Sequence, residues 1–188
     1  MGSEVNLSEL CLTGKGRYGI AASAVDYSPN LPTYLRITDI NDNGTLNLSG
    51  LKSIDDTNSK KYELREGDIV FARTGASVGR NYLYDVRDGN FVFAGFLIGF
   101  TLDKALINPR WVKYYCQSKS YQDWVTSHIS GSTRGNINER AFASLPIPVP
   151  SRDYQDKAVT LLDSIEDSCR ALTQTNGHLY PSEFVLAA

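Results

Sequence analysis

The segment Pro146-Ile-Pro-Val-Pro150 divides this chain more sharply than any other feature of its sequence. Each proline holds φ at about −65°, lacks an amide donor and pushes the preceding residue out of the helical region, so the segment is predicted to be extended. Ser151 can cap a helix, and apolar residues then recur every three or four positions. The sequence therefore predicts a domain over 1–150, a final helix over 151–177 and a tail over 178–188 with no assigned function.

Upstream of the prolines, the pattern first indicates strands and then helices. Short apolar or β-branched runs at 34–38, 67–71 and 81–85 predict strands, and the run 91–100, which contains two glycines, predicts one further buried strand. Asn108 and Pro109 suit a helix start, and helical spacing follows, with a second short helix beyond Ser120 and a third at 139–143. We expect an α+β fold: a mixed, mainly antiparallel, curved sheet with short helices, followed by a long C-terminal helix.

The last predicted helix carries one apolar stripe. Its members are Ala158, Leu161, Leu162, Ile165, Cys169 and Leu172. Such a stripe can pack on the helix's own domain, or it can join a second chain as a coiled coil. The spacing alone leaves both interpretations open.

Charge and cysteine content limit the classes of function. The net charge is −2, but residues 60–135 hold eleven basic and seven acidic side chains, a net +4, between flanking segments of −3 each. This clustering permits a local phosphate-binding face. The three cysteines are far apart and form no Cys-x-x-Cys pair, so we expect neither a disulfide framework nor a metal site. Without an apolar run of membrane length or a signal peptide, the chain is expected to be cytoplasmic.

Motifs that would indicate catalysis are weak. Residues 14–19 match G-x-G-x-x-G, but no buried strand precedes them and no helix follows, so we interpret them as a flexible loop. Asn108-Pro-Arg-Trp111 is close to the Asn-Pro-Pro-aromatic motif of amino-methyltransferases, yet it fits a helix start better. The sequence predicts no hydrolase, nuclease or metal centre, and the chain is expected not to be an enzyme.

Two polar segments suit contacts with nucleic acid. Residues 73–80 place two arginines, two hydroxyl groups and two glycines in one connection, and residues 132–138 hold a second group of hydroxyl, amide and guanidinium side chains. These groups can bind phosphates and base edges. For any single residue, a structural role in the turn is an equally good interpretation.

Four blocks, taken together, resemble the specificity subunits of bacterial type I restriction-modification enzymes. They are Tyr34-Leu-Arg-Ile-Thr-Asp-Ile40, the segment from Leu64 through Gly67-Asp-Ile-Val-Phe-Ala-Arg-Thr-Gly-Ala-Ser-Val-Gly79, Asn136-Ile-Asn138, and Leu145-Pro-Ile-Pro-Val-Pro150 with Gln155 beyond it. Their order and spacing cover about residues 15 to 172. The resemblance implies a target-recognition domain that reads half of a split DNA sequence, followed by one spacer helix. It also favours the coiled-coil interpretation of that helix.

The resemblance further implies partners and contact residues. The expected partners are double-stranded DNA, methyltransferase subunits, motor-nuclease subunits that join through the complex, and a second copy of this chain. This chain needs no cofactor of its own, because S-adenosylmethionine is expected on the methyltransferase subunit. The candidate DNA-binding residues are Lys15, Arg17, Lys60, Lys61, Arg73, Thr74, Arg80, Ser132, Arg134 and Asn136.

Two other interpretations remain at this point. The chain can be a catalytic fragment of a fused restriction-methylation enzyme, which the missing cofactor motif opposes. It can also be an assembly partner of methyltransferase subunits that does not bind DNA, which the modest net charge supports. Residues that specify bases are expected in the less patterned loops, 15–33 and 41–62.

Overall fold

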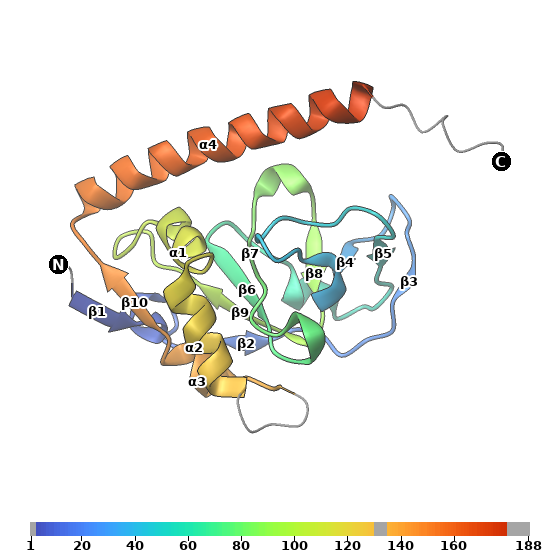
Figure 1. Ribbon diagram of the computed structural model, residues 1–188. Helices are drawn as coiled ribbons and strands as arrows, with labels where there is room; N and C mark the ends of the chain where they lie inside the picture. The colour runs from blue at the N-terminus through green and yellow to red at the C-terminus, as the bar shows by residue number, and fades with distance from the viewer. Residues whose placement is uncertain (1–2, 130–134, 180–188) are drawn as a thin grey trace.

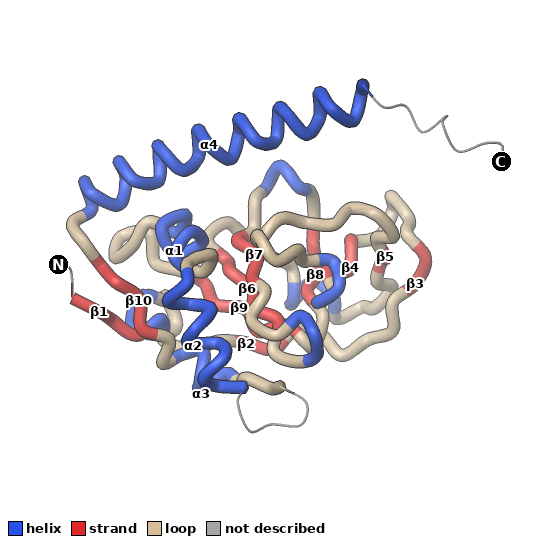
Figure 2. Tube along the Cα trace, in the orientation of Figure 1, coloured by secondary structure: helices blue, strands red, loops and turns tan. Residues whose placement is uncertain are grey.

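The computed structural model describes residues 3–129 and 135–179, whose path is drawn in Figure 1 and coloured by type of secondary structure in Figure 2. Within these residues the strands form two four-stranded sheets and one two-stranded ribbon. Helices α1 to α3 lie together beside one sheet, and α4 passes above the domain (Figure 1). The predicted α+β class, with mainly antiparallel sheets, short helices and a long final helix, is confirmed.

The ribbon joins the two ends of the domain. β1 (Ser3–Asn6) pairs antiparallel with β10 (Pro146–Val149), so that Asn6 lies opposite Pro146. The proline segment is therefore extended, as predicted, and a two-stranded ribbon tolerates its missing amide donors because each strand has an unpaired side. The sequence did not indicate that residues near the N-terminus would be its partner.

The central sheet has the order β2-β9-β6-β7 and is antiparallel throughout. Its strands are β2 (Arg17–Tyr18), β9 (Leu97–Thr101), β6 (Asp68–Ala72) and β7 (Asn81–Leu83). Side chains of β6 alternate between two core clusters: Ile69 and Phe71 face one, and Val70 and Ala72 face the other. The sheet is thus buried on both faces, which explains why residues 69–72 form a continuous apolar run.

The second sheet has the order β3-β5-β4-β8. Its strands are β3 (Val25–Asp26), β5 (Lys52–Ser53), β4 (Thr33–Leu35) and β8 (Phe91–Phe93), and β4 and β8 are parallel. The strand predicted over 34–38 is shorter, because the chain turns into a 3-10 helix at Ile37–Asp39. The Asp39 carboxylate fixes this turn by accepting hydrogen bonds from the backbone and side chain of Arg36.

The single strand predicted over 91–100 is wrong. β8 ends at Phe93 and β9 begins at Leu97, in the other sheet. Between them the chain makes a turn, closed by a hydrogen bond from the Leu97 amide to the Ala94 carbonyl at 2.8 Å. Both strands are buried, so the two apolar runs merge in the sequence, and only pairing with different neighbours separates them.

Helices cover the face of the central sheet that carries Phe71. α1 (Pro109–Tyr115), α2 (Lys119–Ile129) and α3 (Glu139–Ala143) confirm the three short helices predicted. The Phe71 ring stacks on Phe142 of α3 with ring centroids 4.8 Å apart. The Asn108 side chain accepts a hydrogen bond from the Arg110 amide, which confirms its capping role.

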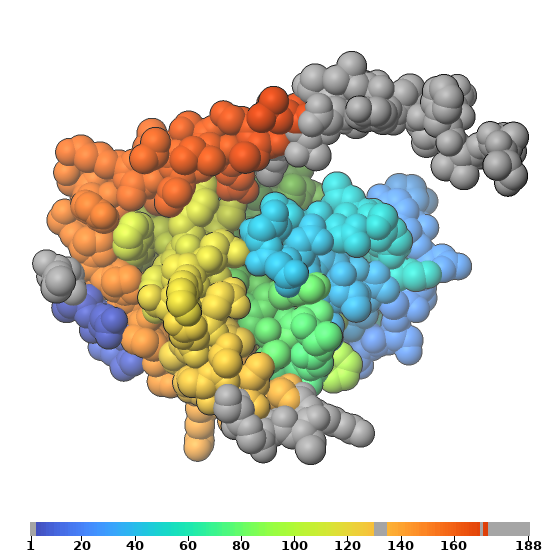
Figure 3. Space-filling view, viewed as in Figure 1, coloured from blue at the N-terminus to red at the C-terminus, as the bar shows by residue number. Residues whose placement is uncertain are grey.

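The final helix, α4 (Arg152–Leu179), is 28 residues long and continues past Gly177. It leaves β10 through Ser151, whose hydroxyl accepts a hydrogen bond from the Tyr154 amide at 3.4 Å. The orange turns of α4 lie directly on the rest of the domain in the space-filling view (Figure 3). Among the described residues, no helix is long and apolar enough to cross a bilayer.

Candidate nucleic-acid interface

The two arginines of the 73–80 connection diverge. Arg73 and Arg80 lie at the two ends of the loop that joins β6 to β7, and the backbone of Ala72 accepts from Gly79 and donates to Arg80. The Arg80 side chain turns toward the 40–42 segment, where it pairs with Asp42 at 2.6 Å and donates to the Ile40 carbonyl. The Arg73 side chain turns instead toward β2. They therefore do not form one phosphate clamp.

Arg73 is the centre of a second cluster. Its guanidinium lies 5.0 Å from the centroid of the Tyr18 ring, and its Nε donates to Asn136 Oδ1 at 3.4 Å. Thr74 and Asn136 form an isolated antiparallel bridge, and the Ile137 amide donates to the Arg73 carbonyl. The structure thus brings together three of the candidates, Arg73, Thr74 and Asn136, from segments more than sixty residues apart in the chain.

Arg17 is half-buried and its charge is paired within the domain. Its guanidinium pairs with the Asp68 carboxylate at 2.9 Å, lies 4.7 Å from the centroid of the Phe93 ring and donates to the Lys61 and Glu63 carbonyls. Asp68 is buried and also accepts from the Thr101 hydroxyl and the Arg65 amide. The segment predicted as a flexible loop therefore contains strand β2, and its Arg17 links β2 to β6 by an ion pair and to the 61–63 segment by hydrogen bonds.

The lysine candidates are exposed. Lys15, Lys60 and Lys61 all have exposed side chains, and within residues 3–129 and 135–179 no ion pair links any of them, or Arg73, to a carboxylate. Their charges remain available to phosphates, unlike those of Arg17 and Arg80. Ser132 and Arg134 lie outside the described residues. Asn138, their neighbour in the same polar segment, caps α3 by accepting from the Ala141 amide.

Two aromatic residues near Arg73 were missed by the sequence analysis. Tyr18 is 42% exposed, and Phe96, in the turn between β8 and β9, is 61% exposed. The single-strand prediction for 91–100 placed Phe96 in a buried strand, so nothing marked it. A turn predicted between the two halves of this run would have placed Phe96 at the surface.

The apolar stripe of α4 divides into two groups. Leu161, Ile165 and Leu172 are 63%, 51% and 64% exposed, and Cys169 is exposed as well. Ala158 and Leu162 are half-buried. The stripe therefore points largely away from the domain to which α4 belongs.

Polar residues attach the other face of α4 to α1. The buried Gln155 side chain accepts a hydrogen bond from the Asn108 amide at 2.9 Å and donates to the Pro150 carbonyl at 2.8 Å. Further along, Arg110 pairs with Asp163 at 2.7 Å, and the largely buried Lys113 pairs with Glu166 at 2.7 Å. Burial raises the pKa of Glu166, but the hydrogen bond and charge of Lys113 outweigh it, so that the pKa is lowered.

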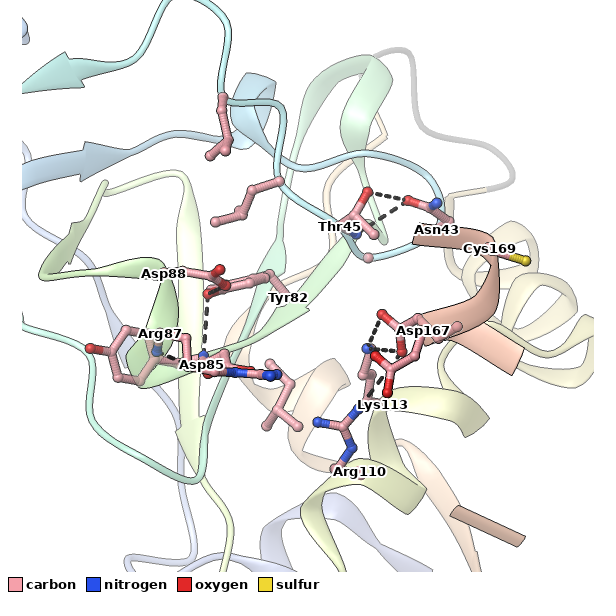
Figure 4. Close-up of a pocket in the computed structure, with 16 residues that line it drawn as sticks. Asn43, Thr45, Tyr82, Asp85, Arg87, Asp88, Arg110, Lys113, Asp167 and Cys169 are labelled. Carbon is pink, nitrogen blue, oxygen red and sulfur yellow. Dashed lines mark hydrogen bonds and ion pairs between the residues drawn. The ribbon is translucent and has the colours of Figure 1, made fainter. Parts of the chain in front are cut away.

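A cleft of about 640 Å³ lies between α4, the end of β7 and the 43–48 loop (Figure 4). Charged side chains of both signs line it, among them Asp85, Arg87, Arg110 and Asp167. A hydrogen bond from Arg87 lowers the pKa of Asp85 to about 2, so this carboxylate is ionised and paired. The part of the chain that the structure describes holds no group of three or more potential metal ligands, here or elsewhere.

Comparison with known families supplies the deciding observation. The family model described as "Type I restriction modification DNA specificity domain" matches residues 3–177, nearly the whole chain. The chain belongs to this family. The resemblance drawn from the four sequence blocks is thereby confirmed, and the chain is a DNA specificity domain of a type I restriction-modification system, the component that specifies rather than catalyses. No sequence of a curated protein matches it.

Solved structures share the fold of this specificity domain. It is similar to a chain from a study of complex assembly and conformational transition of the type I restriction-modification system, with a TM-score of 0.64 and 15% identity, over 98% of this chain and 51% of that one. The HsdS subunit of Thermoanaerobacter tengcongensis is similar with a TM-score of 0.61 and 16% identity, over 98% of this chain and 51% of that subunit. The S subunit of M. genitalium is similar with a TM-score of 0.61 and 17% identity, over 92% of this chain and 41% of that subunit. The specificity domain thus spans about half the length of these subunits.

Proposed function

We propose that this specificity domain reads one half of a bipartite target in double-stranded DNA, and that two copies pair through α4 to read both halves. Methyltransferase subunits dock on the pair, and motor-nuclease subunits join through that complex in the cytoplasm. The observation that carries the proposal is the outward-facing stripe of α4 on a domain that spans half of its structural relatives.

The two faces of α4 support pairing between copies. Its inner face is occupied by α1, through Gln155, Asp163 and Glu166. The exposed Leu161, Ile165 and Leu172 are separated by four and seven residues, which is the spacing of one side of a coiled coil. Fully burying each of these side chains contributes about 1.5–3 kcal/mol, a sufficient driving force for association of two such helices.

The oligomeric state tests this pairing directly. Light scattering on the full chain is expected to give a dimer, and the double variant Leu161→Asp/Ile165→Asp is expected to give a folded monomer, because it places two charges in the proposed seam. Thr160→Asp adds a charge at an exposed position of α4 that the helical period places off the stripe, and it should remain dimeric. A wild-type monomer at micromolar concentration would overturn the proposed pairing.

DNA contact by the Arg73 cluster has a separate test. We expect Arg73→Ala to weaken binding to DNA duplexes and to reduce the slope of log affinity against log salt by about one, since one phosphate contact is lost. Arg87→Ala is the matched control, because Arg87 is exposed but pairs with Asp85 beside the cleft. Equal affinity of the wild type and Arg73→Ala at low and moderate salt would remove Arg73 from the interface. No duplex binding by the wild-type dimer at low salt would favour the assembly-partner interpretation.

A further inference from the structure

The turn between β8 and β9 presents one apolar side chain on a rigid backbone. Phe96 is 61% exposed, whereas Phe93 before the turn and Leu97 after it are fully buried. The turn is fixed by hydrogen bonds from the Gly95 amide to the Ile20 carbonyl and from the Arg73 amide to the Phe96 carbonyl, at 2.8 and 3.0 Å. A phenyl ring held in this way loses little backbone entropy when it binds a partner.

The neighbours of Phe96 indicate which partner this ring meets. Arg73, whose amide holds the Phe96 carbonyl, extends its guanidinium over the exposed Tyr18 ring and toward Asn136. Among the described residues no ion pair joins Arg73 to a carboxylate. Arg73 supplies a cation that no carboxylate in the described part of the chain neutralises, and Asn136 supplies an amide side chain. Such groups bind DNA phosphates and base edges.

We propose that Phe96 is a specificity-determining residue that contacts the 5-methyl group of a thymine, while Arg73 beside it holds the adjacent DNA. The inference rests on the proposed function, that this domain reads DNA. Phenylalanine cannot hydrogen-bond to a base edge, so the only feature of a base pair that it recognises in the major groove is the thymine methyl group. The rigid turn supplies the fixed position that such recognition requires.

The experiment begins with duplexes selected by the wild-type chain from a random pool. Each thymine of the selected target is then replaced by uracil, which removes only the methyl group, and binding is measured for the wild type and for Phe96→Ala. At one thymine per half-site the wild type should lose about fourfold in affinity, as expected for one buried methyl group, and Phe96→Ala should lose nothing further. The variant should melt at the wild-type temperature, since its side chain is largely exposed.

Leu106→Ala is the matched control. Leu106 is exposed to a similar degree but follows β9, whereas Phe96 precedes it, so the two lie at opposite ends of that strand. This control should keep the full sensitivity to uracil. Equal sensitivity in wild type and Phe96→Ala at every thymine would overturn the inference while leaving the proposed function standing. So would a Phe96→Ala variant with unchanged DNA binding but weakened binding of a methyltransferase subunit. A wild-type chain that selects no sequence would instead remove the proposed function itself.

Discussion

The glycines at 14, 16 and 19 form a G-x-G-x-x-G motif without the preceding strand and following helix of a nucleotide site. They match a dinucleotide-binding pattern, but here Gly14 has a φ of 65°, and Gly16 and Gly19, on either side of β2, allow the chain to approach its neighbours closely. A Cβ on Gly16 would lie 2.7 Å from the Phe100 ring, and one on Gly19 would lie 2.2 Å from the Ala94 carbonyl oxygen. Close packing thus gives Gly16 and Gly19 a physical role that does not involve a nucleotide.

Gly19→Ala should therefore be severely destabilising. Because the obstructing atoms belong to backbone, they cannot move aside as a side chain would, and we expect a loss of about 3 kcal/mol in the free energy of unfolding. Gly50→Ala separates this clash from backbone strain, since Gly50 has φ of 73° but nothing within 4 Å of its Cβ position. It should cost about 1 kcal/mol. Urea denaturation of both variants checks this, and equal losses would show that contact at Gly19 is unimportant.

At the scale of elements, ion pairs between α4 and α1 add to the buried Val159 and to the contact between the Trp111 and Tyr154 rings. Lys113 has only 13% of its side chain exposed, and its ammonium group contacts both oxygens of Glu166. Glu166→Gln leaves that cation without its full countercharge, so docking of α4 on α1 should weaken by about 2 kcal/mol. Hydrogen exchange of α4 amides should accelerate. Asp153→Asn, which breaks the exposed Asp153–Lys157 pair on the same helix, should leave exchange nearly unchanged.

The docking of α4 on α1 through Glu166 should weaken in acid. The folded-state pKa of Glu166 is lowered from 4.5, so its contribution to stability is present above that value and is lost as pH falls through the lower folded-state pKa. Relative to the intrinsic exchange rate at each pH, the protection of the α4 amides should fall as the pH drops below 4.5, before the rest of the domain unfolds, and Glu166→Gln should remove this step. Simultaneous exchange of α4 and the central sheet in acid would contradict the prediction.

At the scale of the whole molecule, the proposed pairing of two copies through α4 would determine the form of the DNA target. Two identical domains related by a two-fold axis would read two copies of one half-site in inverted orientation, separated by a fixed spacer. Duplexes selected from a random pool should contain such interrupted palindromes. Changing the spacer by about five base pairs, half a helical turn, should reduce affinity to that of a single half-site. Selection of one asymmetric motif would be inconsistent with this arrangement.

The sequence by itself determined the features that depend on neighbouring residues. Asn108 and Pro109 start a helix, the prolines at 146–150 hold an extended strand, and the stripe after Ser151 continues as one long helix. Caps, fixed φ angles and helical period all act over a few residues, so they can be read directly from the chain. The blocks at 34–40, 64–79, 136–138 and 145–150 also led to the correct family.

Only the tertiary structure decided which distant residues meet. Residues 91–100 are divided between two sheets, and Arg17 forms an ion pair with Asp68. The side chains of Arg73 and Arg80 turn in different directions, toward Tyr18 and Asp42. These outcomes depend on strand pairing and ion pairs across tens of residues, which no local pattern encodes. The contacts of the Arg73 side chain with Tyr18 and Asn136, and of its amide with the Phe96 carbonyl, have the same origin, because four separate segments of the chain come together there.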